Sequence, residues 1–455
     1  CLEGLRPLEI YPHKLAKPQP FQKEFAAASW RLDQDKWWDF YNYSGEAMDW
    51  LMDKMAEYGI GTVIENTRTD PVGDMSIPSF SHAFVTKEHP EAGASQQIAV
   101  EAMAQEILKL GGRIDYNTTA KQLEKDETGR VVSTVALRDG AYIRYVGTKG
   151  IILATGDFSR DRDMVAKYCP MALPFGLGGV YEGEGHKMAL WIGAAWQKYT
   201  PNAPMIVSMG DEVLPCRWWA DGAGTTFPGL LVNAKGIRYC DEDSLYGYAP
   251  YPQKVQPGGY SFLIWDDNWV YDSAPWVGDA IGAPDRDTQE VYDTIQTLFT
   301  TDAGSKATDE YAGFNASMGT AVKADTLEEL ADGLGFEGKN KEAFLAQVER
   351  YNEYCETGID EEYHKDKRYL LPVLQPPFYG IKNEPYTLCI EGGLNVNRMQ
   401  EVCDANSDPI PGLFGVGTLI GDCIGDTYNF RIWGHNLGMN CVTAGYRLGK
   451  RLATI

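Results

Sequence analysis

The stretch from Gly412 to Lys450 could carry chemistry, because small residues, an irregular loop and a helix start follow one another in it. Its first part is a short apolar strand that ends in Gly417 and Thr418, where small residues let the backbone approach a ligand closely. Near Asn436 and Leu437 a helical pattern begins, and a helix start offers free N–H groups and positive potential to an anionic or electron-rich ligand. Taken alone, the stretch favours an ordinary strand–loop–helix unit at the edge of a sheet.

Other segments also place small residues where a ligand could approach. The run 150–156 predicts a buried strand that ends in Ala154, Thr155 and Gly156, and ligands of α/β proteins bind at such carboxyl ends. Gly183, Glu184 and Gly185 precede a helix predicted over 186–193, and Gly392 and Gly393 interrupt an apolar run. A single Ala-Thr-Gly is a weak motif.

Helices and strands that could position these segments are readable from periodicity. A helix is predicted over 36–58 from the spacing of Met48, Leu51 and Met55, with Ser44 as a candidate N-cap. Three or four strands are predicted over 113–158, around turns at 127–129 and 139–140. The remaining predictions are an irregular arm over 1–30, a helix after Ser95, a hairpin over 229–239, a helix opened by a capping box at Thr326 and an amphipathic helix over 341–354.

Composition excludes several classes of function. The formal net charge of −23 over 455 residues argues against nucleic acid or an anionic membrane as the main partner. The nine cysteines contain no C-x-x-C pair, which argues against zinc ribbons and ferredoxin-type clusters, and no histidine pair suggests a metal. No run of 18 apolar residues is present, so no membrane span is expected.

Taken together, the motifs resemble the fumarate reductase/succinate dehydrogenase flavoprotein family. The resemblance rests on Thr118 to Leu123, on 151–158, on Gly183-Glu184-Gly185 and on the run from Gly392 to Thr418. The chain departs from the family pattern at Cys389-Ile390-Glu391 and at Thr418, where the family usually has an acid. The resemblance implies FAD as the cofactor and backbone or side-chain contacts to it from Ala120, Ala154, Thr155, Gly156, Gly183, Glu184, Gly185, Gly392, Gly393, Gly417, Thr418, Asn436 and Leu437. Because Gly224-Thr225-Thr226 lacks the spacing of the covalent attachment motif, non-covalent FAD is expected.

The family's N-terminal strand and G-x-G-x-x-G turn have no counterpart in the 455 residues. Either the sequence omits a segment of the native protein, which is the interpretation we favour, or the pyrophosphate site was lost. The predicted fold class is therefore α/β with an α+β cap: a Rossmann-like FAD-binding domain, without its N-terminal βαβ unit in this chain, and an inserted cap domain. The expected boundaries are 1–205 for the first part of the FAD domain, 206–372 for the Trp- and Tyr-rich substrate cap, and 373–455 for the second part.

Candidate catalytic residues follow from the same resemblance. Eight residues after Arg238, where fumarate reductases carry an arginine proton donor, this chain has Tyr246, as in the catalytic-tyrosine segment of 3-oxosteroid dehydrogenases. A phenol with an ordinary pKa of roughly 10 can exchange a proton next to a carbonyl. Tyr428 and the backbone of Gly434 are candidates for binding the carbonyl oxygen. Arg431 could instead hold a substrate carboxylate, although each of these residues could equally be a packing residue.

The predicted function is an FAD-dependent oxidoreductase acting on CH–CH groups, either an ene-reductase or a 3-ketosteroid-type dehydrogenase. Hydride would pass between flavin N5 and a C=C bond conjugated to a carbonyl. The expected partner is a small unsaturated carbonyl substrate, with a steroid-like compound and an electron-donor protein as further candidates. One alternative is a fumarate- or urocanate-like enoate reductase that uses Arg431. An alternative of another class is a cofactor-less binding protein on the same fold.

Overall fold

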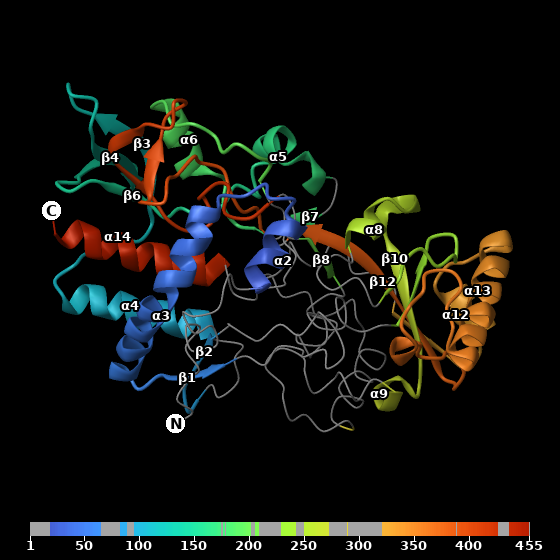
Figure 1. Cartoon of the computed structure of the whole chain (residues 1–455). Coiled ribbons are helices and arrows are strands. Elements are labelled where there is room, and N and C mark those ends of the chain that lie inside the picture. The colour runs from blue at the N-terminus through green and yellow to red at the C-terminus, as the bar shows by residue number, and fades with distance from the viewer. Residues whose placement is uncertain are drawn as a thin grey trace.

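The computed structural model describes residues 19–64, 82–88, 95–173, 176–177, 179–201, 205–208, 229–242, 250–272, 289, 321–387, 389–425 and 436–454. Figure 1 shows two groups of elements, one on the side of the C-terminus and one on the opposite side, joined by a long strand. Both groups mix helices with strands, as the predicted fold class requires.

The N-terminal part of the described chain contains two helices that share a core. Helix α3 (Gln34–Glu57) confirms the helix predicted over 36–58. Its N-cap is Asp33, whose carboxylate accepts a hydrogen bond from the N–H of Asp35 at 3.0 Å. The predicted cap at Ser44 is wrong, because the apolar face of the helix runs through that position and buries it in mid-helix.

The irregular arm predicted over 1–30 is wrong for its last third, because helix α2 spans Gln19–Ala27. A proline in the first turn does not oppose a helix, since the N–H it lacks would have no partner there. Phe21 and Phe25 are four residues apart and place their rings 5.2 and 5.8 Å from the ring of Trp37, which is fully buried. Aromatic packing against α3 therefore fixes α2 in place.

A small unit packs against α3 and is made of β1 (Gly61–Ile64), β2 (His82–Val85) and α4 (Ser95–Lys109). The two strands pair antiparallel. Buried residues of α3, β2 and α4 form one hydrophobic cluster that includes Met55, Phe84 and Ala102. The helix predicted after Ser95 is thus confirmed, and it begins at Ser95 itself.

Next in the chain comes an antiparallel sheet of three strands, β3 (Thr118–Lys125), β4 (Val131–Arg138) and β5 (Ala141–Val146). The turns between them lie at the residues that the sequence predicts. Strand β4 also touches β14 (Pro409–Gly415) and β6 (Ile151–Leu153), so the sheet packs beside a second one.

This second sheet has the order β13–β14–β6, where β13 spans Glu401–Cys403. Strand β14 pairs antiparallel with β13 and parallel with β6, with Leu413 opposite Ile151 and Gly415 opposite Leu153. Because β6 and β14 run in the same direction, their carboxyl ends meet at one edge. The strand predicted over 150–156 is shorter than expected, since it ends at Leu153.

Two helices follow β6, namely α5 (Arg162–Tyr168) and α6 (Glu184–Trp191). On the other side of the molecule, β9 (Leu230–Asn233), β10 (Ser261–Asp266), β11 (Ala321–Ala324) and β12 (Phe378–Thr387) form a sheet in the order β11–β12–β10–β9. Short elements near this sheet are α8 (Pro250–Lys254) and α9 (Trp269–Asp272).

Strand β12 links the two groups of elements. Its first half pairs with β10 and β11, whereas its end pairs with β7 (Gly176–Leu177) and β8 (Met205–Ser208). In Figure 1 it runs from the side of α12 (Leu327–Gly333) and α13 (Gly338–Thr357) toward β7 and β8. The predicted domain boundary at 373 stays a prediction, and β12 just beyond it shares hydrogen bonds with strands of both groups.

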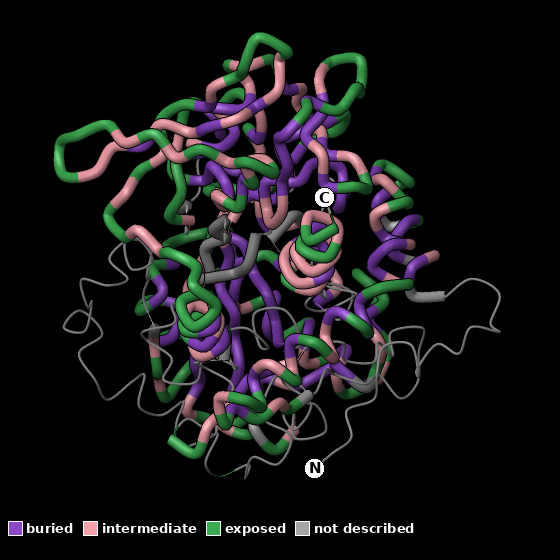
Figure 2. Tube along the Cα trace, turned by 90° about the vertical axis from the view of Figure 1, so that its left-hand side faces the viewer, coloured by how far each residue is buried: buried purple, intermediate pink, exposed green. Residues whose placement is uncertain are grey.

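Helices α12 and α13 cover the β9–β12 sheet with a core of their own, in which Leu230, Ile264, Leu330 and Phe344 are fully buried. The predicted helix start at Thr326 is confirmed, because Thr326 is the N-cap and its Oγ1 accepts a hydrogen bond from the N–H of Glu329 at 3.2 Å. Figure 2 shows that buried segments run through the interior while the exposed residues lie on loops and outer helix faces.

The chain closes with a π-helix, η7 (Asn436–Thr443), that continues into α14 (Ala444–Ala453). Both pack against α3. Met439, Ala444 and residues of α3 belong to the same hydrophobic core as Leu153 and Leu413. The helical pattern predicted after Gly434 is therefore confirmed, and it is anchored beside the ends of β6 and β14.

Candidate functional site

The parallel strands β6 and β14 place two of the predicted segments side by side. The N–H of Val416 donates a hydrogen bond to the carbonyl of Leu153 at 2.9 Å. Ala154, Thr155 and Gly156 follow one strand, and Gly417 and Thr418 follow the other. Because both segments leave the sheet at its carboxyl edge, their small residues lie at the position where α/β proteins bind ligands.

The loop that carries Gly392 and Gly393 joins the same edge. The N–H of Gly392 donates to the carbonyl of Thr418 at 2.7 Å, and the N–H of Leu394 donates to the carbonyl of Leu419 at 3.0 Å. Gly392 has a φ of +119° and Gly393 a φ of +138°, which L side chains rarely adopt. A Cβ at Gly393 would lie 2.3 Å from Nε2 of His186, so this approach is open to glycine alone.

The start of α6 packs on the segment after β6. Gly183 is the N-cap, and Glu184 and Gly185 form the first turn. A Cβ at Gly185 would lie 2.0 Å from Oγ1 of Thr155, so the helix start directly covers that side chain. Ala120, on β3, packs against the neighbouring core and lies on a strand that contacts α6.

Helix η7 begins near the end of β14. The N–H of Gly417 donates to the carbonyl of Asn440 at 2.7 Å. Leu437, in the first turn, is 43% exposed. The structure thus brings together the predicted residues at 154–156, 183–185, 392–393, 417–418 and 436–437, which come from five separate parts of the chain.

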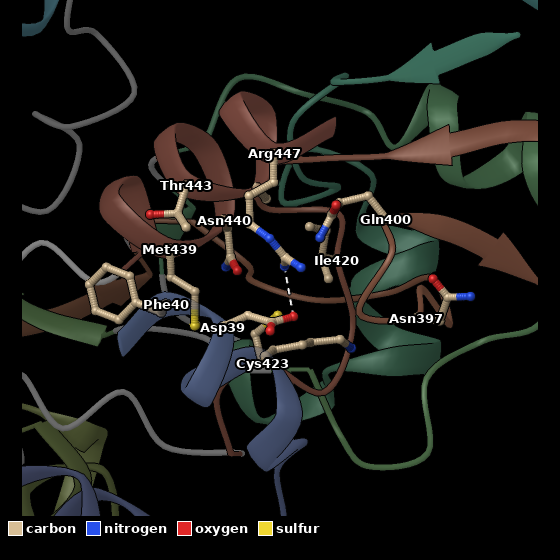
Figure 3. A pocket seen from close by; sticks show the side chains of 12 residues that line it. Asp39, Phe40, Asn397, Gln400, Ile420, Cys423, Met439, Asn440, Thr443 and Arg447 are labelled. Carbon is tan, nitrogen blue, oxygen red and sulfur yellow. Dashed lines mark hydrogen bonds and ion pairs between the residues drawn. The ribbon is translucent and has the colours of Figure 1, made fainter. Parts of the chain in front are cut away.

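A small cavity lies between α3 and the C-terminal helices (Figure 3). Arg447 reaches across it to Asp39, with 2.7 Å between Nη1 and Oδ2, and Arg398 binds the other oxygen of Asp39. Lys36 donates to the carbonyl of Gly421 at 2.7 Å. The cavity volume of about 20 Å³ suffices for a water molecule and not for a cofactor. The ion pair between Arg447 and Asp39 at this cavity links α14 to α3.

Three titratable groups are buried behind the strand ends. His186 lies next to the rings of Phe158 and Trp196, and burial lowers its pKa to about 4. Its Nε2 is 3.1 Å from the carbonyl of Gly392, so the neutral ring donates its proton there. Burial also raises the pKa of Asp157, and burial together with the charge of Asp157 raises the pKa of Glu391 well above its ordinary value.

The residues present fit an extended dinucleotide such as FAD. Oγ1 of Thr155 is buried without a hydrogen-bond partner among the described residues, directly under the N-terminus of α6. A hydroxyl in that position is available to a polar group of a ligand. Gly417 has room where a Cβ would lie, with Sγ of Cys441 the nearest atom at 3.9 Å, so a ligand can approach its backbone closely. The corresponding space at Gly392 and Gly393 is filled by the side chains of Gln197 and His186.

Sequence reasoning missed the side chains that hold these segments together. Asp157 accepts hydrogen bonds from the N–H of Ile390 at 2.7 Å and from Oγ of Ser159 at 3.1 Å. Oε1 of Gln197 accepts from the N–H of Gly393, and Asp422 accepts from the N–H groups of Lys198 and Tyr199. None of these residues has a spacing pattern in the chain that could have revealed it, because each acts on a partner distant in sequence.

The proposed acid/base residue, Tyr246, lies outside the described residues, as do Tyr428, Arg431 and Gly434. The description stops at Glu242, four residues before Tyr246. There the hairpin predicted over 229–239 forms a turn in which the N–H of Gly236 donates to the carbonyl of Asn233.

The end of this hairpin is held by a buried charge network that sequence reasoning did not identify. Arg238 lies 2.8 Å from a carboxylate oxygen of Glu242 and 2.8 Å from one of Asp360. Lys365 lies 3.2 Å from Glu242 and donates to the hydroxyl of Tyr351. All four charged groups are buried. Burial would raise the pKa of Glu242, but Lys365 and Arg238 hold it below its ordinary value.

Within the part of the chain that the structure describes, no group of three or more His, Cys, Asp or Glu side chains is arranged to hold a metal ion. Among the same residues no helix has the length and apolar character needed to cross a bilayer.

Comparison with known proteins places these features in a family. The family model described as an FAD binding domain matches residues 15–429. A vinyl phenol reductase of Lactiplantibacillus plantarum is 25% identical over 98% of this chain and 86% of its own length. A fumarate reductase (cytochrome) of Shewanella frigidimarina is 25% identical over 90% of this chain, which spans 62% of that protein.

Among solved structures, the 3-ketosteroid delta1-dehydrogenase of Sterolibacterium denitrificans in complex with 1,4-androstadiene-3,17-dione has the same fold. Its TM-score is 0.68 and its identity 18%, over 97% of this chain and 89% of that one. The mixed helix and strand fold predicted from the sequence agrees with this neighbour.

Proposed function

Because this chain belongs to the FAD binding domain family, and is thereby an FAD-dependent oxidoreductase as predicted, we propose that it transfers hydride between FAD and a C=C bond conjugated to a carbonyl or an aromatic ring. The observation that carries the proposal is the convergence of the glycine-bearing segments on the carboxyl ends of β6 and β14. The three related proteins named above act, by their names, on a vinyl phenol, on fumarate and on a 3-ketosteroid. In each case the substrate or the product carries a C=C bond conjugated to a carbonyl or an aromatic ring.

The chain's own residues would hold FAD through the five segments at the strand ends. Thr155 offers a hydroxyl with no partner among the described residues, the α6 start offers backbone N–H groups next to Gly183, and Gly417 offers close backbone approach. Gly392 and Gly393 are proposed to contact FAD through their backbone, as in the family. Ala120 is proposed to contact the adenine, as in the family. Once bound, FAD supplies the hydride acceptor or donor, and the protein orients the substrate and moves the proton. No covalent link to the flavin is proposed.

Tyr246 is proposed to exchange the proton with the carbon that does not receive the hydride. Tyr428 and the backbone N–H of Gly434 would bind the carbonyl oxygen and stabilise the enolate. Reduction of the double bond and its reverse use the same groups. The Trp- and Tyr-rich composition of 206–372 suits an apolar ring substrate better than it suits fumarate.

A second candidate is an enoate reductase in which Arg431 holds a substrate carboxylate by two parallel hydrogen bonds. It is favoured by the likeness to fumarate reductase. A cofactor-less binding protein is not retained, because the chain belongs to an FAD-binding family. An electron-donor protein remains a prediction.

The test is an absorbance spectrum of the purified protein with FAD, followed by anaerobic titration. The flavin band should be bleached by dithionite and restored by one member of a panel that contains a vinyl phenol, a 3-keto-4-ene steroid, fumarate and urocanate. Restoration by the first two supports the proposal, and restoration by fumarate or urocanate alone supports the Arg431 alternative. A fully reduced flavin that none of the four reoxidises contradicts both.

A further inference from the structure

Glu391 is an acid buried directly beside the proposed cofactor loop. It is 4% exposed, and its Oε2 has no hydrogen-bond partner among the described residues. It immediately precedes Gly392 and Gly393, whose positive φ values commit the backbone to one path. A carboxyl group in such a place is stable as the neutral acid, because a buried carboxylate without a partner loses its hydration and gains nothing in return.

The described residues around Glu391 provide no compensating positive charge. The groups that interact with it are the carboxyl of Asp157, at the end of β6, and the thiols of Cys389 on its own loop, Cys423 after β14 and Cys441 on η7. No cation among the described residues faces it. The oxygens of Asp157 are already used by Ile390 and Ser159. Burial and the charge of Asp157 raise the pKa of Glu391, in agreement with this geometry.

The loop around Glu391 is held by hydrogen bonds on both sides. Ile390 donates to Asp157, Gly392 to the carbonyl of Thr418 and Gly393 to Gln197. If Glu391 lost its proton to solvent, a second negative charge would lie beside Asp157 in a dry interior. Movement of the loop toward water would relieve that charge, and it would break these hydrogen bonds.

We propose that Glu391 is a positioning residue: its protonated carboxyl keeps the Gly392–Gly393 loop against β14, and loss of the proton releases the loop and weakens FAD binding. The inference rests on the proposed contact of Gly392 and Gly393 with FAD. It makes cofactor retention sensitive to a rise in pH through one residue.

The experiment is a titration of apoprotein with FAD, followed by flavin fluorescence without substrate, at several values from about pH 6 to about pH 9. The Kd of the wild type should be constant at the acid end and then rise by up to about tenfold per pH unit, since one proton is lost. Glu391→Gln keeps the shape and cannot ionise, so its Kd should stay constant. Asp163→Asn, which removes an exposed carboxylate on α5, should follow the wild type.

A further variant separates positioning from simple packing. Asp157→Asn removes the neighbouring charge and leaves one acceptor oxygen for the two hydrogen bonds from Ile390 and Ser159, so its Kd should be higher than that of the wild type at every pH. Because Glu391 should ionise more readily beside the neutral amide, the rise in Kd should begin at lower pH. Equal pH profiles for the wild type and Glu391→Gln would overturn the inference, as would an equal loss of affinity by Glu391→Gln at every pH. Circular dichroism of each apoprotein checks that it is folded. If the wild type binds no FAD at any pH, the cofactor site itself fails, which is a different result.

Discussion

The carboxylate of Asp157 accepts a hydrogen bond from the backbone N–H of Ile390 at 2.7 Å, across 233 positions of sequence. Asp157 follows Gly156 at the end of β6, and Ile390 precedes the loop of Gly392 and Gly393. A carboxylate that accepts a backbone N–H in a buried place forms a strong and directional bond. This one bond therefore sets the register between two segments of the proposed cofactor site.

Gly393→Ala should displace the loop that carries Gly392 and Gly393 from its position beside His186. The new Cβ would lie 2.3 Å from Nε2 of His186, and the φ of +138° is unfavourable for alanine. We expect the affinity for FAD to fall at least about tenfold and the free energy of unfolding to fall by roughly 1–3 kcal/mol. Flavin fluorescence titration and urea unfolding measure the two quantities.

The matched control is Gly129→Ala in the β3–β4 turn. Gly129 also has a positive φ, of +83°, but no atom lies within 4 Å of the added Cβ. The Gly129→Ala variant should bind FAD with the affinity of the wild type. If both variants lose FAD affinity to the same extent, backbone strain alone is the cause and the close approach to His186 is irrelevant.

In mild acid, His186→Gln should lose less free energy of unfolding than the wild type. The folded-state pKa of His186 is about 4, below its ordinary value of 6.5, because the ring is buried. Between these values the unfolded chain binds a proton that the folded chain does not, so the folded state loses stability as the pH falls. The difference between the two pKa values corresponds to a loss of at most about 3 kcal/mol in the free energy of unfolding. Glutamine can still donate to the carbonyl of Gly392.

The measurement is urea unfolding of the apoprotein at about pH 7 and about pH 4. The wild type should lose about 3 kcal/mol more than His186→Gln between the two conditions. His364→Gln, at an exposed position, should behave like the wild type. A loss that is the same in all three proteins would show that His186 is protonated in the folded state.

Arg238→Met should destabilise the protein strongly. The substitution leaves Glu242 and Asp360 buried with only Lys365 to balance them. Removal of one partner from a buried charge network costs about 3–5 kcal/mol. Arg144→Met breaks a surface pair with Glu124, and it should cost less than about 1 kcal/mol. Urea unfolding compares the two, and similar losses would mean that the buried network is no stronger than a surface pair.

Tyr246→Phe should lower turnover without changing FAD binding, since it removes only the proposed proton donor. The expected loss in kcat is on the order of 10²–10⁴-fold, the usual contribution of a positioned acid or base. Tyr142→Phe, at a side chain that is 73% exposed on β5, should leave kcat unchanged. If Tyr246→Phe kept full activity and Arg431→Met were inactive, the enoate mechanism would be favoured over the Tyr246 mechanism.

Local patterns in the sequence were sufficient for several elements. Apolar spacing predicted α3 and α13, the turn residues predicted the β3–β4–β5 hairpins, and Thr326 predicted the start of α12, because each depends on neighbours a few positions away. Family motifs predicted the family, the enzyme class and the cofactor, and the comparisons confirm these three predictions. The domain boundaries, the missing N-terminal βαβ unit and the roles of individual site residues stay predictions.

Contacts between distant segments were decided by the tertiary structure alone. The cap of α3 is at Asp33 because the burial of Ser44 depends on what packs against the helix. The hydrogen bond of Asp157 to Ile390 and the buried network of Arg238 bring together residues with no periodic relation in sequence. The sequence determined which residues are small, apolar or charged. Only the fold determined which titratable side chains are buried away from water. This desolvation gives Glu391 and His186 their altered pKa values.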